Sequence, residues 1–158
     1  MCSSDLTTTN STSGGGSGYM LKLNSTTLAQ QARVLMKDAR TTANNAAIYD
    51  DGTASPIVGP DGDVFFGVLE NPFGSNNWRG WLLHWDGSLT QTKLPGAFGW
   101  DDTPSIVPAS AVPSYTGASP YLVMSKYNNY GGSATGTGLN KVAVLDPRVS
   151  FTEPVSGV

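Results

Sequence analysis

Short runs of apolar residues alternate with clusters of turn-forming residues along the chain, and one kind of run occurs three times. The copies are residues 19–24 (YMLKLN), 81–86 (WLLHWD) and 141–146 (KVAVLD), each a strand-length apolar segment that closes on Asn or Asp. The second closing residue lies 62 positions after the first, and the third lies 60 positions after the second. A recurrence of this length, built from strands and turns, is typical of β repeat proteins whose units stack on one another.

A second phrase recurs ahead of the later copies, as residues 50–58 (DDGTASPIV) and 101–107 (DDTPSIV). The acid pair that opens each phrase could ligate calcium or act as acid and base. Its repetition favours carboxylates that cap turns, because one catalytic site rarely needs two copies. Residues 61–63 (DGD) are typical of a hairpin turn. His84 is interpreted as a satisfied strand residue, because the sequence marks no partner with which it could act as a general base.

The spacing of apolar runs and turns predicts four strands in each unit. In the middle unit the predicted strands are residues 55–59, 64–69, 81–86 and 89–94. In the next unit they are residues 105–109, 121–127 and 141–146, with a possible fourth beginning within 149–155. Four consecutive antiparallel strands joined by turns form a β-propeller blade. The predicted fold class is therefore all-β, an incomplete β-propeller fragment of about two and a half four-stranded antiparallel blades.

The boundaries of these units follow from the same pattern. Residues 1–18 are expected to be a disordered or artefactual segment, and residues 19–158 the propeller fragment, divided into 19–49, 50–99 and a truncated 100–158. Residues 1–6 resemble the translation of a common sequencing-adapter end, which predicts that the chain is a fragment of a longer protein. Residues 7–18 are rich in Ser, Thr and Gly, as in a flexible loop. Residues 28–47 have the composition of a helix, but the repeat favours a strand there.

Three phrases of the middle unit carry a resemblance to a known family. They are residues 54–58 (ASPIV), 62–67 (GDVFFG) and 81–86 (WLLHWD). This order of a Ser-Pro strand, an Asp-Gly turn and two further strands is similar to the repeat of the quinoprotein-type (PQQ-like repeat) β-propellers. The similarity covers roughly residues 19–158. It implies a propeller and suggests quinone-dependent dehydrogenase activity, although a fold does not fix a function.

The residues that such an enzyme would use are not recognisable in this chain. The resemblance implies a vicinal cysteine pair against the cofactor and a calcium ion with an acid ligand, but Cys2 is the single cysteine. We therefore expect no cofactor and no metal, and a role in binding rather than catalysis. The alternative is a fragment of a quinone-type oxidoreductase or a sugar-acting propeller enzyme whose active site lies outside this chain.

Composition narrows the class of partner. Charged residues make up 13% of the chain and the formal net charge is −3, so no basic stripe is available to neutralise phosphates, and nucleic acid is not an expected partner. The apolar runs fall far short of the roughly 20 residues of a membrane helix, so no membrane span is expected. Low charge and a single cysteine are compatible with a bacterial secreted or periplasmic protein, which is the expected location.

Aromatic residues in or beside the predicted loops are the candidate contact residues. Flat rings can cover the C–H faces of sugars while neighbouring amides bond to the hydroxyl groups. The predicted ligand-binding residues are Trp78, Trp100, Tyr127, Tyr130, Asn76, Asn77, Asn128 and Asn129. The alternative is that these rings fill gaps between blades. The sequence thus predicts a binding scaffold for a glycan or a protein, with the remaining blades of a longer parent chain as further partners.

Overall fold

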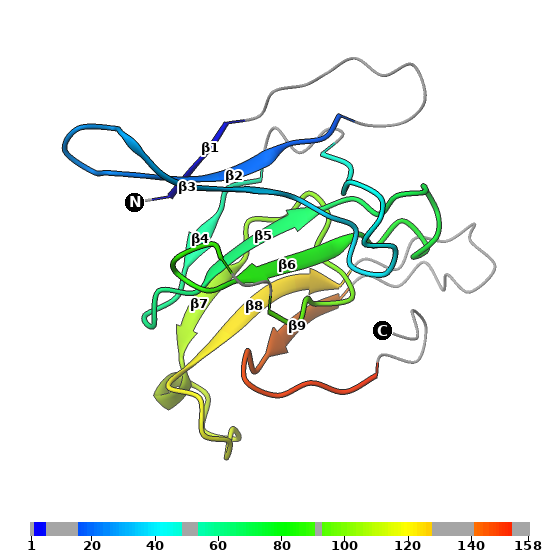
Figure 1. Cartoon of the computed structure of the whole chain (residues 1–158). Helices are drawn as coiled ribbons and strands as arrows, with labels where there is room; N and C mark the ends of the chain where they lie inside the picture. Colours follow the sequence, from blue (N-terminus) through cyan, green and yellow to red (C-terminus); the bar gives the residue numbers. More distant parts are fainter. Residues whose placement is uncertain (1, 6–15, 49–53, 91–92, 128–140, 153–158) are drawn as a thin grey trace.

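The chain forms nine β-strands in the computed structural model, which describes residues 2–5, 16–48, 54–90, 93–127 and 141–152 (Figure 1). The strands are β1 (Cys2–Asp5), β2 (Tyr19–Leu23), β3 (Gln30–Leu35), β4 (Ile57–Val58), β5 (Val64–Val68), β6 (Trp81–Trp85), β7 (Ser105–Pro108), β8 (Tyr121–Tyr127) and β9 (Lys141–Leu145). One short 3-10 helix, η2 (Ala109–Ala111), joins β7 to the loop before β8. The described part of the chain holds no α-helix, and its fold is all-β as the sequence predicted.

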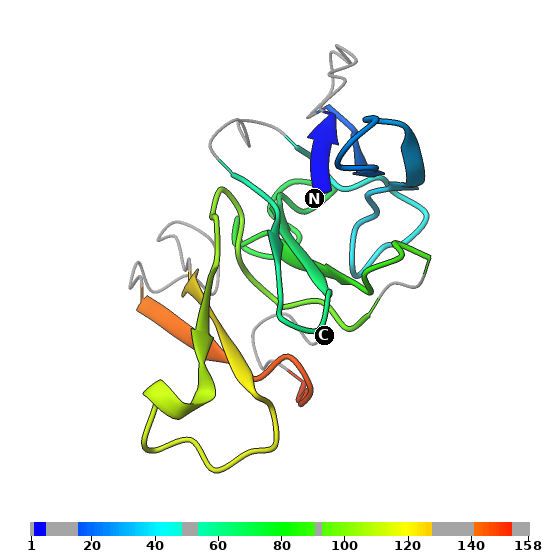
Figure 2. The same ribbon diagram turned by 90° about the vertical axis from the view of Figure 1, so that its left-hand side faces the viewer.

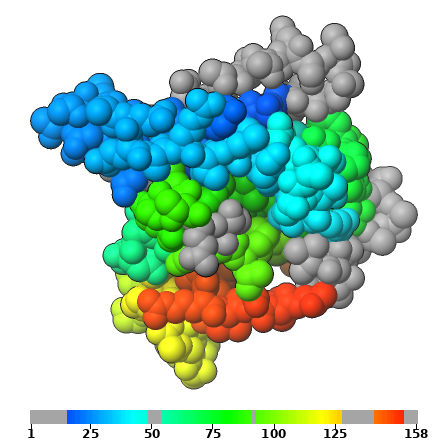
Figure 3. Space-filling view, viewed as in Figure 1, coloured from blue at the N-terminus to red at the C-terminus, as the bar shows by residue number. Residues whose placement is uncertain are grey.

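The strands form three small antiparallel sheets that follow the order of the chain. The first sheet has the order β1-β2-β3, the second β4-β5-β6 and the third β7-β8-β9. Both ribbon views place the second sheet between the other two (Figures 1 and 2). In the space-filling view the blue first sheet, the green second sheet and the yellow-to-red third sheet form successive layers (Figure 3). The three sheets are therefore stacked in sequence order.

The first sheet decides between the two structures expected for residues 28–47. A strand, β3, pairs with β2 in antiparallel fashion, so the helical composition of this segment does not prevail. The hairpin turn is built by Asn24, whose side-chain oxygen accepts hydrogen bonds from the N–H groups of Thr26 and Thr27. Leu28 adopts a φ of 58°, which reverses the chain into β3. Pairing along β2 thus outweighs local propensity.

Residues 2–5 form a strand, although the sequence placed them in a disordered or artefactual segment. They make β1, which pairs with β2 from Cys2 opposite Lys22 to Asp5 opposite Tyr19. The physical reason is that a strand edge presents unpaired N–H and C=O groups, which any extended segment can satisfy whatever its side chains. Pairing of this kind leaves the adapter-like origin of residues 1–6 a prediction.

The two strands β5 and β6 of the second sheet are buried on both faces. All five residues of β5 and all five of β6 are buried, which accounts for their nearly continuous apolar sequence. One core cluster joins the first and second sheets and includes Met20, Met36, Val64, Phe66, Val68, Trp81, Leu83 and Trp85. A second cluster joins the second and third sheets and contains Phe65, Leu82, Tyr121 and Val123. Each fully buried side chain of this size contributes roughly 1.5–3 kcal/mol to folding, so these two interfaces hold the stack together.

A short fourth segment completes the second sheet. Its hydrogen bonds run from Lys93 N to His84 O (2.7 Å), from Gly96 N to Leu82 O (2.8 Å) and from Leu82 N to Gly96 O (3.0 Å). The sequence predicted this strand at residues 89–94, and the pairing falls a few residues later. The shift arises because Asp86 and the buried Leu89, at a φ of 59°, form the turn itself. In the third unit, residues 149–152 form no strand, and residues 153–155 lie outside the described part.

The second and third sheets have the same antiparallel strand directions and the same strand order, and their central strands pair with their neighbours at equivalent positions. Val64 pairs with Val58 on one side and Trp85 on the other. In the third sheet Val123 pairs in the same way with Ile106 and Leu145. The three sequence copies become β2, β6 and β9, and each pairs antiparallel with the strand that precedes it in the chain. Repeated sequence therefore corresponds to repeated position in the sheets.

Candidate functional site

Two aromatic rings are exposed together on the loop that joins β5 to β6. Phe73 is 37% exposed and Trp78 is 43% exposed. Their rings are stacked with centroids 5.7 Å apart and planes inclined by 14°. Parallel stacked rings cover part of each other, and the part of each ring that stays exposed is suited to contact with another apolar or ring-shaped group. Trp78 was among the predicted contact residues, whereas Phe73 was not.

A buried carboxylate holds this loop in shape. Glu70 is fully buried, and its two oxygens accept hydrogen bonds from three backbone N–H groups, those of Asn76 (3.3 Å), Trp78 (2.6 Å) and Gly80 (2.8 Å). The two residues Asn77 and Trp78 have φ values of 57° and 60°, a left-handed conformation that non-glycine residues rarely adopt. Hydrogen bonds to an ionised group are the stronger kind, so Glu70 fixes the backbone that carries the Trp78 ring.

Asn76 has a structural role and is not a contact residue, which corrects the sequence prediction. It is 1% exposed, and its amide donates to the carbonyl oxygens of Gly80 (2.8 Å) and Ala97 (2.9 Å). Its side-chain oxygen accepts a hydrogen bond from Arg79 Nη2 (2.9 Å). A buried amide whose groups are already bonded to the protein has nothing left to offer a ligand.

The other predicted contact residues lie behind the loop or outside the described part. Tyr127 is half-buried, lies edge-on to Phe98 at 4.8 Å and accepts a hydrogen bond from Arg79 Nη1 (3.2 Å). Trp100 is half-buried and packs beside Gly80, and its backbone N–H donates to the Arg79 carbonyl oxygen (3.1 Å). Asn77 is half-buried within the loop. The remaining three predictions, Asn128, Asn129 and Tyr130, fall on residues outside the described part.

A second buried carboxylate anchors the loop to the first sheet. Asp38 Oδ2 accepts hydrogen bonds from Asn71 N (2.9 Å) and from Trp81 Nε1 (2.8 Å). Its Oδ1 accepts from the N–H groups of Arg40 (2.9 Å) and Thr41 (2.6 Å). One side chain therefore ties the segment after β3 to both ends of the loop. Sequence reasoning missed Asp38 and Glu70, because their partners are backbone groups and, for Asp38, the Trp81 indole, which only the fold brings together.

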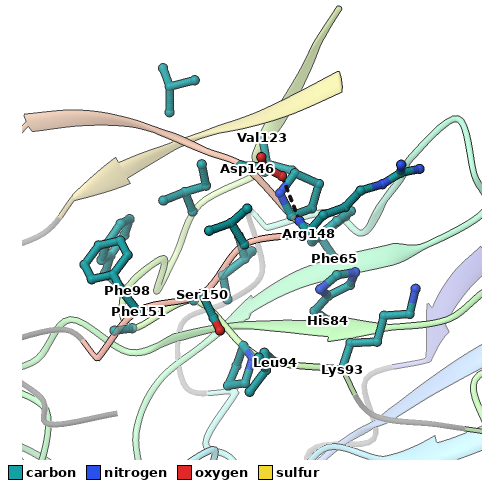
Figure 4. A pocket seen from close by; sticks show the side chains of 18 residues that line it. Phe65, His84, Lys93, Leu94, Phe98, Val123, Asp146, Arg148, Ser150 and Phe151 are labelled. Atoms are coloured by element: carbon teal, nitrogen blue, oxygen red, sulfur yellow. Dashed lines mark hydrogen bonds between the residues drawn. The ribbon is translucent and has the colours of Figure 1, made fainter. Parts of the chain in front are cut away.

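A pocket of about 390 Å³ lies between the second and third sheets (Figure 4). Its wall is mainly apolar and includes Phe65, Leu82, Phe98, Val123, Leu145 and Phe151. The polar groups His84 and Lys93 also line it, and both are bonded to Asp63 Oδ2, at 2.9 Å and 2.5 Å. The pocket is therefore an apolar hollow at a sheet interface, with its basic groups already paired.

The His84 ring is held as a structural group. It stacks on Phe65 with centroids 4.2 Å apart. Burial is the largest influence on His84 and lowers its pKa, although Asp63 acts in the opposite direction. For Asp63, burial alone would raise the pKa, but the hydrogen bonds and charges of Lys93 and His84 together outweigh burial and lower it. A neutral imidazole that donates to an ionised carboxylate fits both shifts.

The described residues include no group of three or more His, Cys, Asp or Glu side chains that could hold a metal ion. Of the two acid pairs, the first lies outside the described part. In the second, Asp102 Oδ2 accepts hydrogen bonds from Ser125 Oγ (2.7 Å) and Lys126 N (2.9 Å), and so braces β8. Asp61 of the hairpin turn accepts a hydrogen bond from Tyr121 Oη (2.8 Å).

No helix within the described ranges is long and apolar enough to cross a membrane.

Comparisons with protein-family models, with curated proteins and with solved structures find no match to this chain.

Proposed function

We propose that the chain is a non-catalytic binding scaffold that presents the loop between β5 and β6 to a glycan or a protein. The observation that carries this proposal is the exposed, stacked pair of Phe73 and Trp78. Exposed aromatic rings on a rigid loop are unusual unless they contact something, because loops on a firm framework are where binding residues gather. The exposed part of the Trp78 ring favours a glycan, since the C–H face of a sugar ring can lie against an indole ring.

Rigidity of the loop supports the same proposal. Glu70 and Asp38 fix its backbone before any ligand arrives, so binding costs little ordering of the loop. The hydrogen bonds of these buried carboxylates go to the loop and its neighbouring strands, so they hold the framework. An enzyme, either a quinone-type oxidoreductase or a sugar-acting propeller enzyme with its active site outside this chain, is the alternative expected from the sequence resemblance.

We further propose that the three sheets are blades of a quinoprotein-like β-propeller. Support comes from the shared order and register of the second and third sheets and from the burial of β5 and β6 on both faces. Propellers close with typically four to eight blades, so a ring built on this pattern needs more sheets than the three described. The sequence predicts these in a longer parent chain. A secreted or periplasmic location belongs to the same proposal.

A glycan array tests the binding function. The intact chain is compared with Trp78→Ala and with Phe151→Ala, a matched control that removes an exposed ring away from the loop. Trp78→Ala should weaken binding by about tenfold, equivalent to the roughly 1.4 kcal/mol expected for one lost ring contact. Phe151→Ala should bind as the unmodified chain does. Thermal unfolding of both variants checks that the fold persists.

Absence of any bound glycan, or an equal loss with Phe151→Ala, would refute the glycan form of the proposal. A protein ligand would instead show itself as a partner whose binding depends on Trp78 but competes with no sugar. If Trp78→Ala changes only the stability of the chain, the ring pair is packing and the binding function is wrong.

A further inference from the structure

The first and second sheets each turn one face toward the next sheet, and the sequence repeat identifies the equivalent position in the third sheet. Met20, Leu82 and Val142 occupy the second position of the three sequence copies. Met20 is 0% exposed, because it lies in the core cluster shared with the second sheet. Leu82 is 2% exposed, because it lies in the cluster shared with the third sheet. Val142 is 71% exposed. The position that is covered twice is thus open in the third sheet.

Two neighbouring positions show the same contrast. Matching the register through the pairs of Val64 with Trp85 and of Val123 with Leu145 makes Met124 equivalent to Phe65, and Val144 equivalent to His84. Phe65 and His84 are buried under the third sheet, whereas Met124 and Val144 are exposed. Met124 and Val144 are also direct partners across β8 and β9. We call Met124, Val142 and Val144 the outer face of the third sheet.

The outer face has the composition of an interface and not of a solvent-facing sheet. Antiparallel sheets with one wet face normally alternate apolar and polar residues, which leaves the wet face polar. Here an unbranched Met and two Val side chains stand on it, with Lys126 beside them, whose Nζ donates to the Asp101 carbonyl (3.4 Å). A contiguous exposed apolar patch marks a surface that another molecule covers.

The opposite end of the stack carries the complementary face. The second sheet turns Trp81, Leu83 and Trp85 toward the first sheet. Their equivalents in the first copy are Tyr19, Leu21 and Leu23, which are half-buried. Strand alternation places them on the side of the first sheet opposite to the buried Met20. Arg33, the cross-strand partner of Leu21, lies over the Tyr19 ring at 3.6 Å on the same side. We call these three residues the leading face. The chain therefore holds both halves of its own sheet-to-sheet interface.

We propose that a second copy of this chain docks head to tail, with the leading face of one copy on the outer face of the other. This inference rests on the blade stacking proposed above and gives the further sheets a source. The contact would repeat the one between the second and third sheets, in which Phe65 and Leu82 pack with Val123. A head-to-tail contact joins two different faces, so it can close a ring. Two copies of three sheets make six, within the usual number of propeller blades.

Sedimentation of the full chain between about 1 and 100 µM, the range in which a micromolar interface is populated, tests the proposal. The unmodified chain should form a discrete dimer of twice 16.5 kDa. The double variant Val142→Lys with Val144→Lys should be a monomer, because each copy then presents two ammonium groups to an apolar face. The matched control, Leu28→Lys with Val58→Lys, places the same charges at two other exposed apolar positions and should remain a dimer.

A mixing experiment tests the direction of docking. Leu21→Lys damages the leading face and should also be a monomer. An equimolar mixture of Leu21→Lys with the Val142→Lys, Val144→Lys variant retains one intact face of each kind and should form a one-to-one dimer. If the mixture stays monomeric, or if only one of the two lesions abolishes association, docking is not head to tail.

Other outcomes refute the head-to-tail dimer without contradicting the proposed glycan binding. A monomeric unmodified chain refutes the second copy as partner and leaves the blades of a parent chain as the occupant of the outer face. Association that survives both lesions is aggregation through another surface. The monomeric variants should still melt cooperatively and bind the same glycans through Trp78. Loss of glycan binding with Trp78→Ala is scored on those variants, so the two proposals fail independently.

Discussion

Replacement of Asp38 by Asn should be one of the most damaging isosteric changes in this chain. The Asp38 carboxylate is 1% exposed and accepts four hydrogen bonds, two at each oxygen. An Asn side chain keeps one oxygen and can therefore satisfy two of the four donors. Its NH₂ group must then face two N–H groups, either those of Asn71 and Trp81 or those of Arg40 and Thr41.

The expected cost follows from these two lost bonds. A hydrogen bond to a charged group contributes about 1.5–3 kcal/mol, so Asp38→Asn should lower the free energy of unfolding by about 3–6 kcal/mol. That is a large share of the roughly 5–15 kcal/mol of a typical domain. Urea unfolding followed by tryptophan fluorescence measures the change, and an unchanged m-value shows that the same surface unfolds.

A control at an exposed carboxylate separates burial from loss of charge. Asp86 accepts hydrogen bonds from Ser88 N, Ser88 Oγ and Thr90 N at the surface of a turn. Asp86→Asn should change stability far less, because water can replace the lost bonds. If Asp38→Asn costs less than about 1 kcal/mol, or no more than Asp86→Asn, then Asp38 does not anchor the loop as described.

Three further predictions concern other parts of the stack. Gly67→Ala should destabilise the chain by roughly 1–3 kcal/mol, because the added Cβ would lie 2.1 Å from the Gly99 carbonyl oxygen; an unchanged melting temperature would contradict this close approach. Burial lowers the pKa of His84, so His84 takes up a proton more readily in the unfolded state than in the folded state. The free energy of unfolding should therefore fall as pH drops below about 6.5. In His84→Gln this part of the pH profile should flatten, and an unaltered slope would show that another group is responsible. Glu70→Gln should cost about 1.5–3 kcal/mol and weaken glycan binding at Trp78, measured by urea unfolding and the array; full binding would show that the loop needs no anchor.

Sequence periodicity was sufficient to predict most of the strands, with the exception of β1, because alternation and turn chemistry are local. The apolar run at residues 64–69 predicted a strand, and β5 forms there with all of its residues buried. The hairpin at Gly62 followed from a glycine that can adopt a φ of 90°. The strand predicted at residues 89–94 was displaced, because the burial of Leu89 inside the turn depends on the packing of distant residues.

The candidate site was only partly predictable for a related reason. Trp78 could be found because an aromatic residue in a polar loop stands out in the sequence. The inward position of Asn76 could not be found, since it depends on the carbonyl of Ala97, which approaches only when the loop folds against the segment after β6. Asp38 and Glu70 were missed because most of their partners are backbone groups, which leave no mark in the sequence, and because Trp81, the side-chain partner of Asp38, is distant along the chain. Phe73 could have been found from its position five residues before Trp78 in the same loop.

Hydrogen exchange of the backbone amides tests most directly whether the second sheet is enclosed by the other two. Segments that contain β5 and β6 should exchange slowest of all, because both faces of these strands are covered and opening them requires separation of the stack. In the monomeric Leu21→Lys variant, the segment that contains β9 should exchange much faster, since its outer face is open when no second copy covers it. Equal rates for β5, β6 and β9, or faster exchange in β5 and β6, would contradict a stack with the second sheet at its centre.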